Sequence, residues 1–330
     1  MLHSVGIVGT GSYVPEKVLT NADLEKMVDT NDEWIVSRTG IKERHIADPE
    51  TPVSELCYQA ALKALEDAKV APEDVDLIII PTVTADYLFP STAGLVADRL
   101  GAKNAAAFDL SAGCTGFLYG ITTGAQFVST GMYRTVLVIG AETLSKILNW
   151  EDRSTCVLFG DGAGAAVLQP VEEGYGFLGF ELGADGSGGH LLTCLGGGSK
   201  NPASIESVQN KLHTIRMAGS EVFKFAVRIM GDASFKVLEK AGLKKEDIDL
   251  FIPHQANLRI IDSAVKRLGI DPEKVVVNLD RYGNTSSASI PLALDEASRG
   301  GRLKYGDNLL MVGFGAGLAW GATVLRWAKR

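Results

Sequence analysis

The sequence contains two copies of one segment, and this repeat constrains the fold more than any other feature. Residues 63–80 read KALEDAKVAPEDVDLIII and residues 236–253 read KVLEKAGLKKEDIDLFIP, an offset of 173 positions at which 9 of the 18 aligned residues are identical. Each copy has the pattern of a helix end, a polar turn and an apolar strand. The same offset aligns a second pair of apolar strands, residues 136–140 and 309–313. We therefore predict two copies of one α/β unit, residues 1–172 and 173–330.

The predicted strands are continuous apolar runs, such as Leu77–Val83, Ala105–Leu110 and Thr135–Gly140 in the first copy. Continuous apolar strands are typical of sheets with helices on both faces. Two such units predict an α/β sandwich in the order helix–sheet–helix–sheet–helix. Ligands of open α/β sheets bind beyond the carboxyl ends of strands, so functional residues should follow strands directly. A glycine-rich stretch, residues 183–198, has no counterpart in the first copy. It is predicted to be a mobile loop over a cleft, and a disordered surface excursion is the alternative interpretation.

The composition limits the classes of function. Of the 330 residues, 46% are hydrophobic and 22% are charged, which is the balance of a soluble globular protein. The net charge of −8 disfavours binding to nucleic acid. No apolar run is long enough to span a membrane and no signal peptide precedes the first strand, so we expect a cytoplasmic protein. The four cysteines form no Cys-x-x-Cys pair, which argues against a metal site and against disulfides.

Cys114 is the first candidate for chemistry. It lies in the segment Asp109-Leu110-Ser111-Ala112-Gly113-Cys114-Thr115-Gly116-Phe117, where a strand ends, small residues form a tight turn and a helix begins. The start of a helix carries partial positive charge and free N–H groups, which favour the nucleophilic thiolate. A free cysteine is also a common small core residue, and we give that role to Cys57, Cys156 and Cys194.

His254 and Asn284 are the second and third candidates. His254 follows the strand of the second repeat, in a position suited to acid–base or hydrogen-bonding work. Asn284 begins a turn that the 173-residue offset aligns with Ser111-Ala112-Gly113-Cys114. Taken alone, His254 could equally be a hydrogen-bonded core histidine, and an asparagine before Thr-Ser is most often a helix cap. Three reactive residue types after strands of one duplicated unit favour a shared active site.

These three motifs resemble the active-site motifs of the β-ketoacyl-acyl-carrier-protein synthase III family, in the thiolase superfamily. The resemblance covers Gly6 to Trp327 and includes the duplication, so it implies a thiolase-like five-layer sandwich. Elongating synthases of the superfamily pair the cysteine with two histidines, whereas this chain has Asn284. Plant-type polyketide synthases share Cys-His-Asn but end in Gly-Phe-Gly-Pro-Gly, and here the corresponding residues are Gly313-Phe314-Gly315-Ala316-Gly317.

The resemblance implies an acyltransferase that starts fatty acid biosynthesis. An acyl-CoA primer would acylate Cys114, while the N–H groups of Cys114 and Ala316 hold the oxyanion. Malonyl-acyl-carrier protein would then lose CO2, and His254 with Asn284 would stabilise the enolate that attacks the acyl group. Ala316 replaces a glycine usual in the family and fits only if its φ is negative. This chemistry requires no metal and no redox cofactor.

Further residues acquire roles from the same resemblance. The CoA-binding residues would be Trp34, Arg38, Arg153, Gly219, Phe223 and Asn257. Phe89, with Tyr87 and Leu88 beside it, would reach across a twofold axis to the primer pocket of a homodimer. The acyl carrier protein is acidic, and its docking site would comprise the basic residues Lys224, Arg259, Lys266 and Arg267, together with Arg228. A basic helix face is otherwise ordinary solvated surface.

The residues leave other functions open. One alternative is another Cys-His-Asn synthase of the thiolase superfamily that uses different acyl substrates. A second is a non-catalytic module that binds acyl-CoA or acyl carrier protein, although such a module has no use for all three residues. A third is a cysteine hydrolase, in which Asn284 would have no clear task. The sequence does not specify whether the primer is acetyl, branched or longer.

Overall fold

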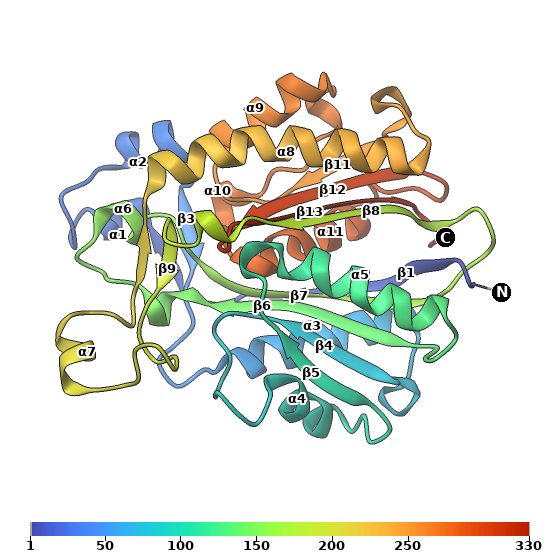
Figure 1. Ribbon diagram of the computed structural model, residues 1–330, viewed down its shortest axis with the longest axis horizontal. Coiled ribbons are helices and arrows are strands. Elements are labelled where there is room, and N and C mark those ends of the chain that lie inside the picture. Colours follow the sequence, from blue (N-terminus) through green and yellow to red (C-terminus); the bar gives the residue numbers. More distant parts are fainter. Residues whose placement is uncertain (1, 330) are drawn as a thin grey trace.

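The computed structural model describes residues 2–329 and arranges the strands in two main sheets (Figure 1). The first sheet has the strand order β1 (Val5–Tyr13), β7 (Asp161–Pro170), β6 (Val136–Thr143), β4 (Leu77–Pro81) and β5 (Ala106–Leu110). The second has the order β11 (Leu250–Pro253), β12 (Asn308–Gly315), β13 (Ala319–Arg326) and β8 (Gly176–Ala184). The chain passes from one sheet to the other between Pro170 and Gly176.

The two sheets repeat one pattern of strand pairing. In the first sheet β4 pairs in parallel with β6, and Leu77 lies opposite Val136. In the second sheet β11 pairs in parallel with β12, and Leu250 lies opposite Leu309. The 173-residue offset of the sequence repeat aligns Leu77 with Leu250 and Val136 with Leu309. The duplication predicted from the sequence is therefore confirmed down to the register of the central strands.

Helices cover both faces of each sheet (Figure 1). The outer face of the first sheet packs against α3 (Val53–Ala68) and α4 (Thr92–Leu100). The outer face of the second packs against α8 (Gly219–Ala241) and α9 (Leu258–Leu268). Between the sheets lie α5 (Gly116–Ser129) and α11 (Ser289–Arg299), which share one core cluster with strands of both sheets. This order confirms the predicted five-layer sandwich.

The middle layer supplies the core that joins the two sheets. Phe117 and Ile121 of α5 and Ile290 of α11 are at most 1% exposed, and they pack between the facing strands. Complete burial of such a side chain contributes about 1.5–3 kcal/mol relative to an exposed position. Because α5 directly follows the turn of Cys114, and α11 follows that of Asn284, this packing also fixes both turns.

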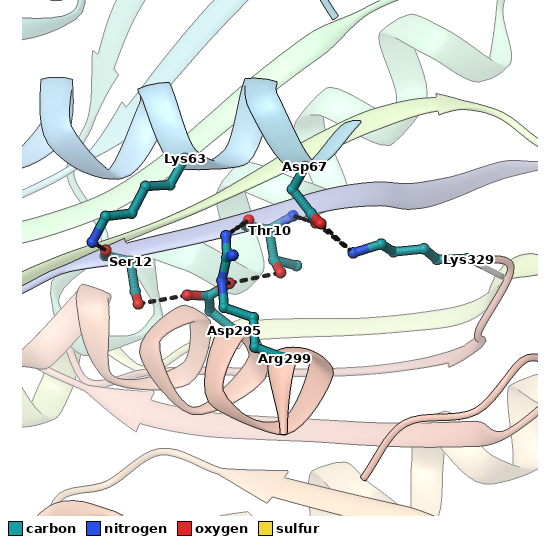
Figure 2. Close-up of polar contacts among 7 residues, drawn as sticks. All are labelled: Thr10, Ser12, Lys63, Asp67, Asp295, Arg299 and Lys329. Carbon is teal, nitrogen blue, oxygen red and sulfur yellow. Dashed lines mark hydrogen bonds and ion pairs between the residues drawn. The ribbon is translucent and has the colours of Figure 1, made fainter. Parts of the chain in front are cut away.

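A polar network adds to the connection between the sheets (Figure 2). The carboxylate of Asp295 on α11 accepts hydrogen bonds from the hydroxyls of Thr10 (2.8 Å) and Ser12 (2.6 Å) on β1. Arg299 donates to the same carboxylate at 2.8 Å and to the Thr10 carbonyl at 3.0 Å. The other members drawn are Lys63, Asp67 and Lys329. The network therefore links a helix of the second half to a strand of the first.

The shorter elements gather at one end of the sandwich. They are β2 (Val18–Thr20), α1 (Asn21–Leu24), α2 (Asp32–Thr39), β3 (Glu43–His45), α6 (Arg153–Cys156), β9 (Leu192–Cys194), α7 (Ile205–Gln209), β10 (Ile215–Met217) and α10 (Leu279–Tyr282) (Figure 1). The glycine-rich stretch leads from β8 into β9, which pairs with β10 to form a small two-stranded sheet. Among residues 2–329, no helix is both long and apolar enough to cross a membrane.

Candidate active site

Cys114 lies in a buried turn between β5 and α5. The turn is a single 3₁₀ turn, Gly113–Thr115, and Cys114 is 9% exposed. The end of β12 presses against it, since a Cβ atom on Gly315 would lie 2.6 Å from the Cys114 nitrogen. Gly113 has φ of 54°, a conformation that favours glycine. Glycines on both segments therefore allow the backbone of the second half to reach the cysteine.

His254 follows β11 and is 1% exposed. Its Nδ1 atom lies 2.6 Å from the hydroxyl of Ser289, the first residue of α11. That hydroxyl also accepts a hydrogen bond from the Gln255 N–H (3.4 Å), so its own proton is free to be donated to Nδ1. Burial lowers the pKa of His254 to about 3, which keeps the ring neutral at physiological pH. Donation of the Ser289 proton to Nδ1 would place the ring proton on Nε2, which has no partner among the described residues.

Asn284 is 7% exposed and is held by contacts on both its backbone and its side chain. Its backbone N–H donates to the Leu158 carbonyl at 2.8 Å. Its side-chain oxygen accepts the Ser286 N–H at 2.9 Å, which identifies the oxygen and nitrogen of the amide. The remaining amide nitrogen is thus a hydrogen-bond donor available to the site.

The three residues line one pocket, which we call the histidine pocket. It also contains the predicted CoA-binding residues Gly219, Phe223 and Asn257, and its volume is about 90 Å³. A Cβ atom on Gly219 would meet only the Met217 side chain at 3.6 Å, an ordinary contact distance, so packing does not require the glycine. Of the residues predicted from sequence, six therefore come together at one place.

A second cavity meets the histidine pocket at Cys114. This apolar cavity has a volume of about 280 Å³, and its lining includes Val83, Leu144, Ile147, Cys194 and Ile215. Cys114, Phe159 and Leu192 line both spaces. Leu192 belongs to β9, so the glycine-rich excursion contributes to the wall of the site. This agrees with the prediction that the glycine-rich stretch lies over a cleft, since its residue Leu192 lines both cavities.

The protonation state expected for Cys114 is wrong. We expected the helix start to favour the thiolate, but burial raises the pKa of the Cys114 thiol to about 11. A hydrogen bond with the Ser286 side chain and the N–H groups of Cys114 and Ala316 lower the pKa only in part. Because desolvation disfavours the charged form, the resting residue is a thiol and its reaction requires a proton acceptor.

The backbone of Ala316 suits an oxyanion hole. Its N–H and that of Cys114 both lower the pKa of the Cys114 thiol, so two backbone donors act on the sulfur. Among residues 2–329, the non-glycine residues with positive φ are Lys69, Lys211 and Ser286. Ala316 is not one of them, so this position accepts alanine without strain.

The predicted nucleotide-binding residues form a stack at the surface. The guanidinium groups of Arg38 and Arg153 each lie 4.9 Å from the ring centroid of Trp34. Arg153 also donates to the Asp29 carbonyl at 2.6 Å. Asn257 connects the stack to the histidine pocket, since its side chain donates to the Arg38 carbonyl at 3.0 Å and caps the N-terminus of α9.

The remaining predicted residues lie outside both cavities. Phe89 is 85% exposed and lines neither cavity of its own chain. Arg259 is exposed and stacks on the Phe223 ring at 5.3 Å, while Arg267 donates to the Arg228 carbonyl and forms an ion pair with Asp232. Further exposed members of the basic surface are Lys224, Arg228 and Lys266.

Three polar residues of the site were missed from sequence: Glu142, Ser286 and Ser289. Glu142 is fully buried at the end of β6, close to the Cys114 turn. A lone carboxylate at the end of a continuous apolar strand is a signal that could have identified it. The two serines lie in the same segment as Asn284, where they read as ordinary turn and helix-start residues.

A buried cysteine of one half shares a pocket with a histidine and an asparagine of the other half, the arrangement that the resemblance predicts for a condensing enzyme of the thiolase fold. Two family descriptions match the chain: 3-oxoacyl-[acyl-carrier-protein] synthase III over residues 108–186, and its C-terminal part over residues 238–327. Together with full-length relatives, these matches place the chain in the β-ketoacyl-[acyl-carrier-protein] synthase III family.

Relatives and solved structures agree with this placement. The chain is 75% identical over 327 residues to the β-ketoacyl-[acyl-carrier-protein] synthase III of Desulfitobacterium hafniense, covering 99% of each chain. It is 63% identical over 326 residues to that of Caldanaerobacter subterraneus, covering 99% of this chain and 98% of the relative. The crystal structure of 3-oxoacyl-[acyl-carrier-protein] synthase III from Aquifex aeolicus superposes with a TM-score of 0.91 at 50% identity, covering 98% and 100% of the two chains.

Proposed function

We propose that the chain joins an acyl-CoA primer to malonyl-acyl-carrier protein by decarboxylative Claisen condensation, through an acyl-Cys114 intermediate. This is the first condensation of fatty acid biosynthesis. The observation that carries the proposal is the pair of unpartnered donors, His254 Nε2 and the Asn284 amide nitrogen, in the pocket of Cys114. Two neutral donors beside an acyl-cysteine suit an enolate, because they stabilise its developing negative charge by hydrogen bonds and do not form an ion pair with it.

The first half-reaction is acylation. The sulfur of Cys114 attacks the thioester carbonyl, and the resulting oxyanion accepts hydrogen bonds from the N–H groups of Cys114 and Ala316. The tetrahedral intermediate then collapses and releases CoA. The acyl group would extend into the apolar cavity, whose volume of about 280 Å³ leaves room for a primer larger than acetyl.

The second half-reaction is decarboxylation followed by attack. Loss of CO2 from the malonyl thioester leaves an enolate, whose oxygen accepts hydrogen bonds from His254 and Asn284. The enolate carbon attacks the acyl carbonyl, and Cys114 leaves. The neutral state of His254, held by burial and by the Ser289 hydroxyl, keeps Nε2 a donor throughout this step.

CoA would bind across the stack and the histidine pocket. The adenine would insert beside Trp34, displacing one of the guanidinium groups that cover the ring in the free protein. Arg38 would then meet a phosphate, and the pantetheine arm would pass Asn257, Phe223 and Gly219 to reach Cys114.

A homodimer would complete the primer site. Tyr87, Leu88 and Phe89 are 62%, 89% and 85% exposed, which is unusual for three consecutive large apolar residues. A second copy covering this segment would remove the apolar surface from water. Phe89 would then contact the primer cavity of the partner copy.

The docking surface for the acidic carrier protein comprises Arg259, Lys266 and Lys224, with Arg228 and Arg267 contributing. We expect Arg259→Glu to raise the KM for malonyl-acyl-carrier protein about 5- to 10-fold at low salt, because reversing a rim charge costs on the order of 1 kcal/mol. Acylation by acyl-CoA should change less than about threefold, and the KM effect should shrink as salt screens the charges. Steady-state and single-turnover assays measure the two effects separately.

Lys103→Glu is the matched control for this prediction. Lys103 is exposed beyond α4, on the opposite outer layer, so the same change of charge there should leave both half-reactions unaffected. Equal losses in the two half-reactions of Arg259→Glu would contradict a docking role. They would instead reflect the contact between Arg259 and Phe223.

Mass spectrometry with a panel of acyl-CoAs tests the proposed function. A stable acyl adduct on Cys114 that malonyl-acyl-carrier protein converts into β-ketoacyl product supports the synthase. Release of free acid supports a hydrolase, and absence of an adduct with every primer supports a binding module. Adduct formation followed by condensation with a different acyl substrate would indicate another synthase of the superfamily.

A further inference from the structure

Glu142 is a fully buried carboxylate that the mechanism above leaves without a task. Its Oε2 atom accepts hydrogen bonds from three groups of the segment after β4: Thr82 Oγ1 (3.3 Å), Val83 N (3.1 Å) and Thr84 Oγ1 (2.8 Å). Its Oε1 atom accepts from the hydroxyls of Ser286 (3.1 Å) and Ser287 (3.0 Å). Among residues 2–329, no Lys, Arg or His forms an ion pair with it. Burying a carboxylate without a cation is costly, so its retention next to the nucleophile calls for a reason.

Ser286 connects Glu142 to the nucleophile. Its hydroxyl donates to Glu142 Oε1 at 3.1 Å, and its side chain lowers the pKa of the neighbouring Cys114 thiol. The residue has φ of 50°, an unfavourable conformation for serine that the bond from its N–H to Asn284 helps to maintain. Cys114 and Ser286 both line the apolar cavity. Ser286 thus lies in the same cavity wall as the sulfur and is hydrogen-bonded to a buried carboxylate.

His254 does not provide an alternative proton acceptor. Its Nδ1 atom is occupied by the Ser289 hydroxyl, and burial lowers the pKa of the ring to about 3, so the imidazole is a poor proton acceptor. The titratable groups whose electrostatics involve Glu142 are two thiols, Cys114 on the catalytic turn and Cys57 on α3, and Cys57 is also influenced by Asp86 and Asp109. Glu142, which is hydrogen-bonded to Ser286 beside Cys114, is therefore a carboxylate placed to take that proton through Ser286.

We propose that Ser286 and Glu142 form a proton relay that takes the thiol proton of Cys114 during acylation and returns it during condensation. The proposal rests on the proposed function. In acylation the sulfur–carbon bond forms while the thiol proton moves to the Ser286 oxygen and the Ser286 proton moves to Glu142 Oε1. CoA leaves as a thiolate and takes a proton from water.

Condensation reverses the relay. The enolate carbon attacks, the bond between sulfur and the acyl carbon breaks, and Glu142 returns its proton through Ser286 to the Cys114 thiolate. The single proton consumed per turnover is the one that CoA took from water. Glu142 therefore stores the cysteine proton for the lifetime of the acyl-enzyme.

The electrostatics of Glu142 suit this storage. Burial raises the pKa of Glu142 to about 7, against the lowering effect of its hydrogen bonds to Thr84, Val83, Ser287 and Ser286. Near neutral pH the carboxylate can thus accept a proton and give it back. Acylation needs the ionised form, so its rate should rise as the pH increases through about 7 and level off above it.

The test compares Glu142→Gln and Ser286→Ala with the wild type between about pH 5.5 and 9.5. Single-turnover acylation by acetyl-CoA and alkylation of Cys114 by iodoacetamide are measured separately by mass spectrometry. Both variants should lose on the order of 100-fold in acylation rate at pH 7, the usual contribution of a positioned base. They should also lose the inflection near pH 7 in both reactions, so that their rates rise steadily with pH.

Ser287→Ala is the matched control, because Ser287 donates to the same Glu142 oxygen without bonding to the sulfur. It should keep the inflection and stay within about threefold of the wild-type rate. An inflection retained in Glu142→Gln or Ser286→Ala, or equal losses in Ser287→Ala, would overturn the relay. If Glu142→Gln does not fold, Ser286→Ala decides alone. If no acyl-CoA of the panel acylates the wild type, the proposed function fails, while the alkylation profile still decides the relay.

Discussion

Replacing Cys114 by serine is expected to reduce condensation by on the order of 1,000-fold or more, because no other group can carry the acyl chain. A serine hydroxyl has a far higher pKa than a thiol, and the buried turn that already raises the pKa of Cys114 to about 11 would disfavour an alkoxide further. Neither the relay nor the oxyanion donors compensate for that difference. The measurements are the acyl adduct by mass spectrometry and the β-ketoacyl product.

Cys194→Ser is the control for this substitution. Cys194 lines the same apolar cavity as Cys114 but lies on β9, away from the catalytic turn. The Cys194→Ser variant should keep a condensation rate within about threefold of wild type, since the substitution removes little buried apolar area. Retention of more than about one per cent of the activity by Cys114→Ser would remove Cys114 from the role of nucleophile.

Substitution of Asn284 is expected to separate the two half-reactions. Loss of one donor to a developing oxyanion typically costs about 100- to 1,000-fold, so Asn284→Ala should release CO2 from malonyl-acyl-carrier protein at no more than about one per cent of the normal rate. Acylation should fall only about threefold, because the Ser286 N–H loses its acceptor while the relay residues remain. His254→Ala should show the same separation. Adduct formation and CO2 release are measured in separate assays.

Asn284→Asp makes this prediction sharper. The aspartate keeps an oxygen for the Ser286 N–H but removes the amide donor, so its decarboxylation should fail as in the alanine variant. Any variant of Asn284 that decarboxylates normally but cannot be acylated would place this residue with the nucleophile instead.

Much of the fold could be predicted because the duplication is recorded in the sequence without gaps over the central strands. The offset that aligns residues 63–80 with 236–253 also relates the strand register of the two sheets. Cys114, His254 and Asn284 could be identified because each belongs to a local motif that follows a strand or aligns with one that does. Their meeting in one pocket follows from the pseudo-symmetry of the halves.

Other features depend on contacts that local sequence does not record. The partners of Glu142 lie in the segment after β4 and in the turn at residues 286–287, so its role emerges only when the halves pack together. The pKa of Cys114 was misjudged because burial of its turn comes from β12, far along the chain. The sequence also did not reveal that Arg267, a predicted docking residue, forms an ion pair with Asp232 of α8.

Cys114 belongs to one half of the molecule and the proposed donors, His254 and Asn284, to the other. The distances that the proposed reaction requires therefore span the interface between the halves. A misplacement of the reacting groups by about 1 Å can lower the rate by a factor of 100, so the interface between the halves must be rigid. The interleaved helices α5 and α11, the Asp295 network and the hydrogen bonds of Glu142 all cross it. Substitutions at this interface, even far from Cys114, would therefore change the rates of the two half-reactions at a smaller loss of stability than is needed to unfold the protein.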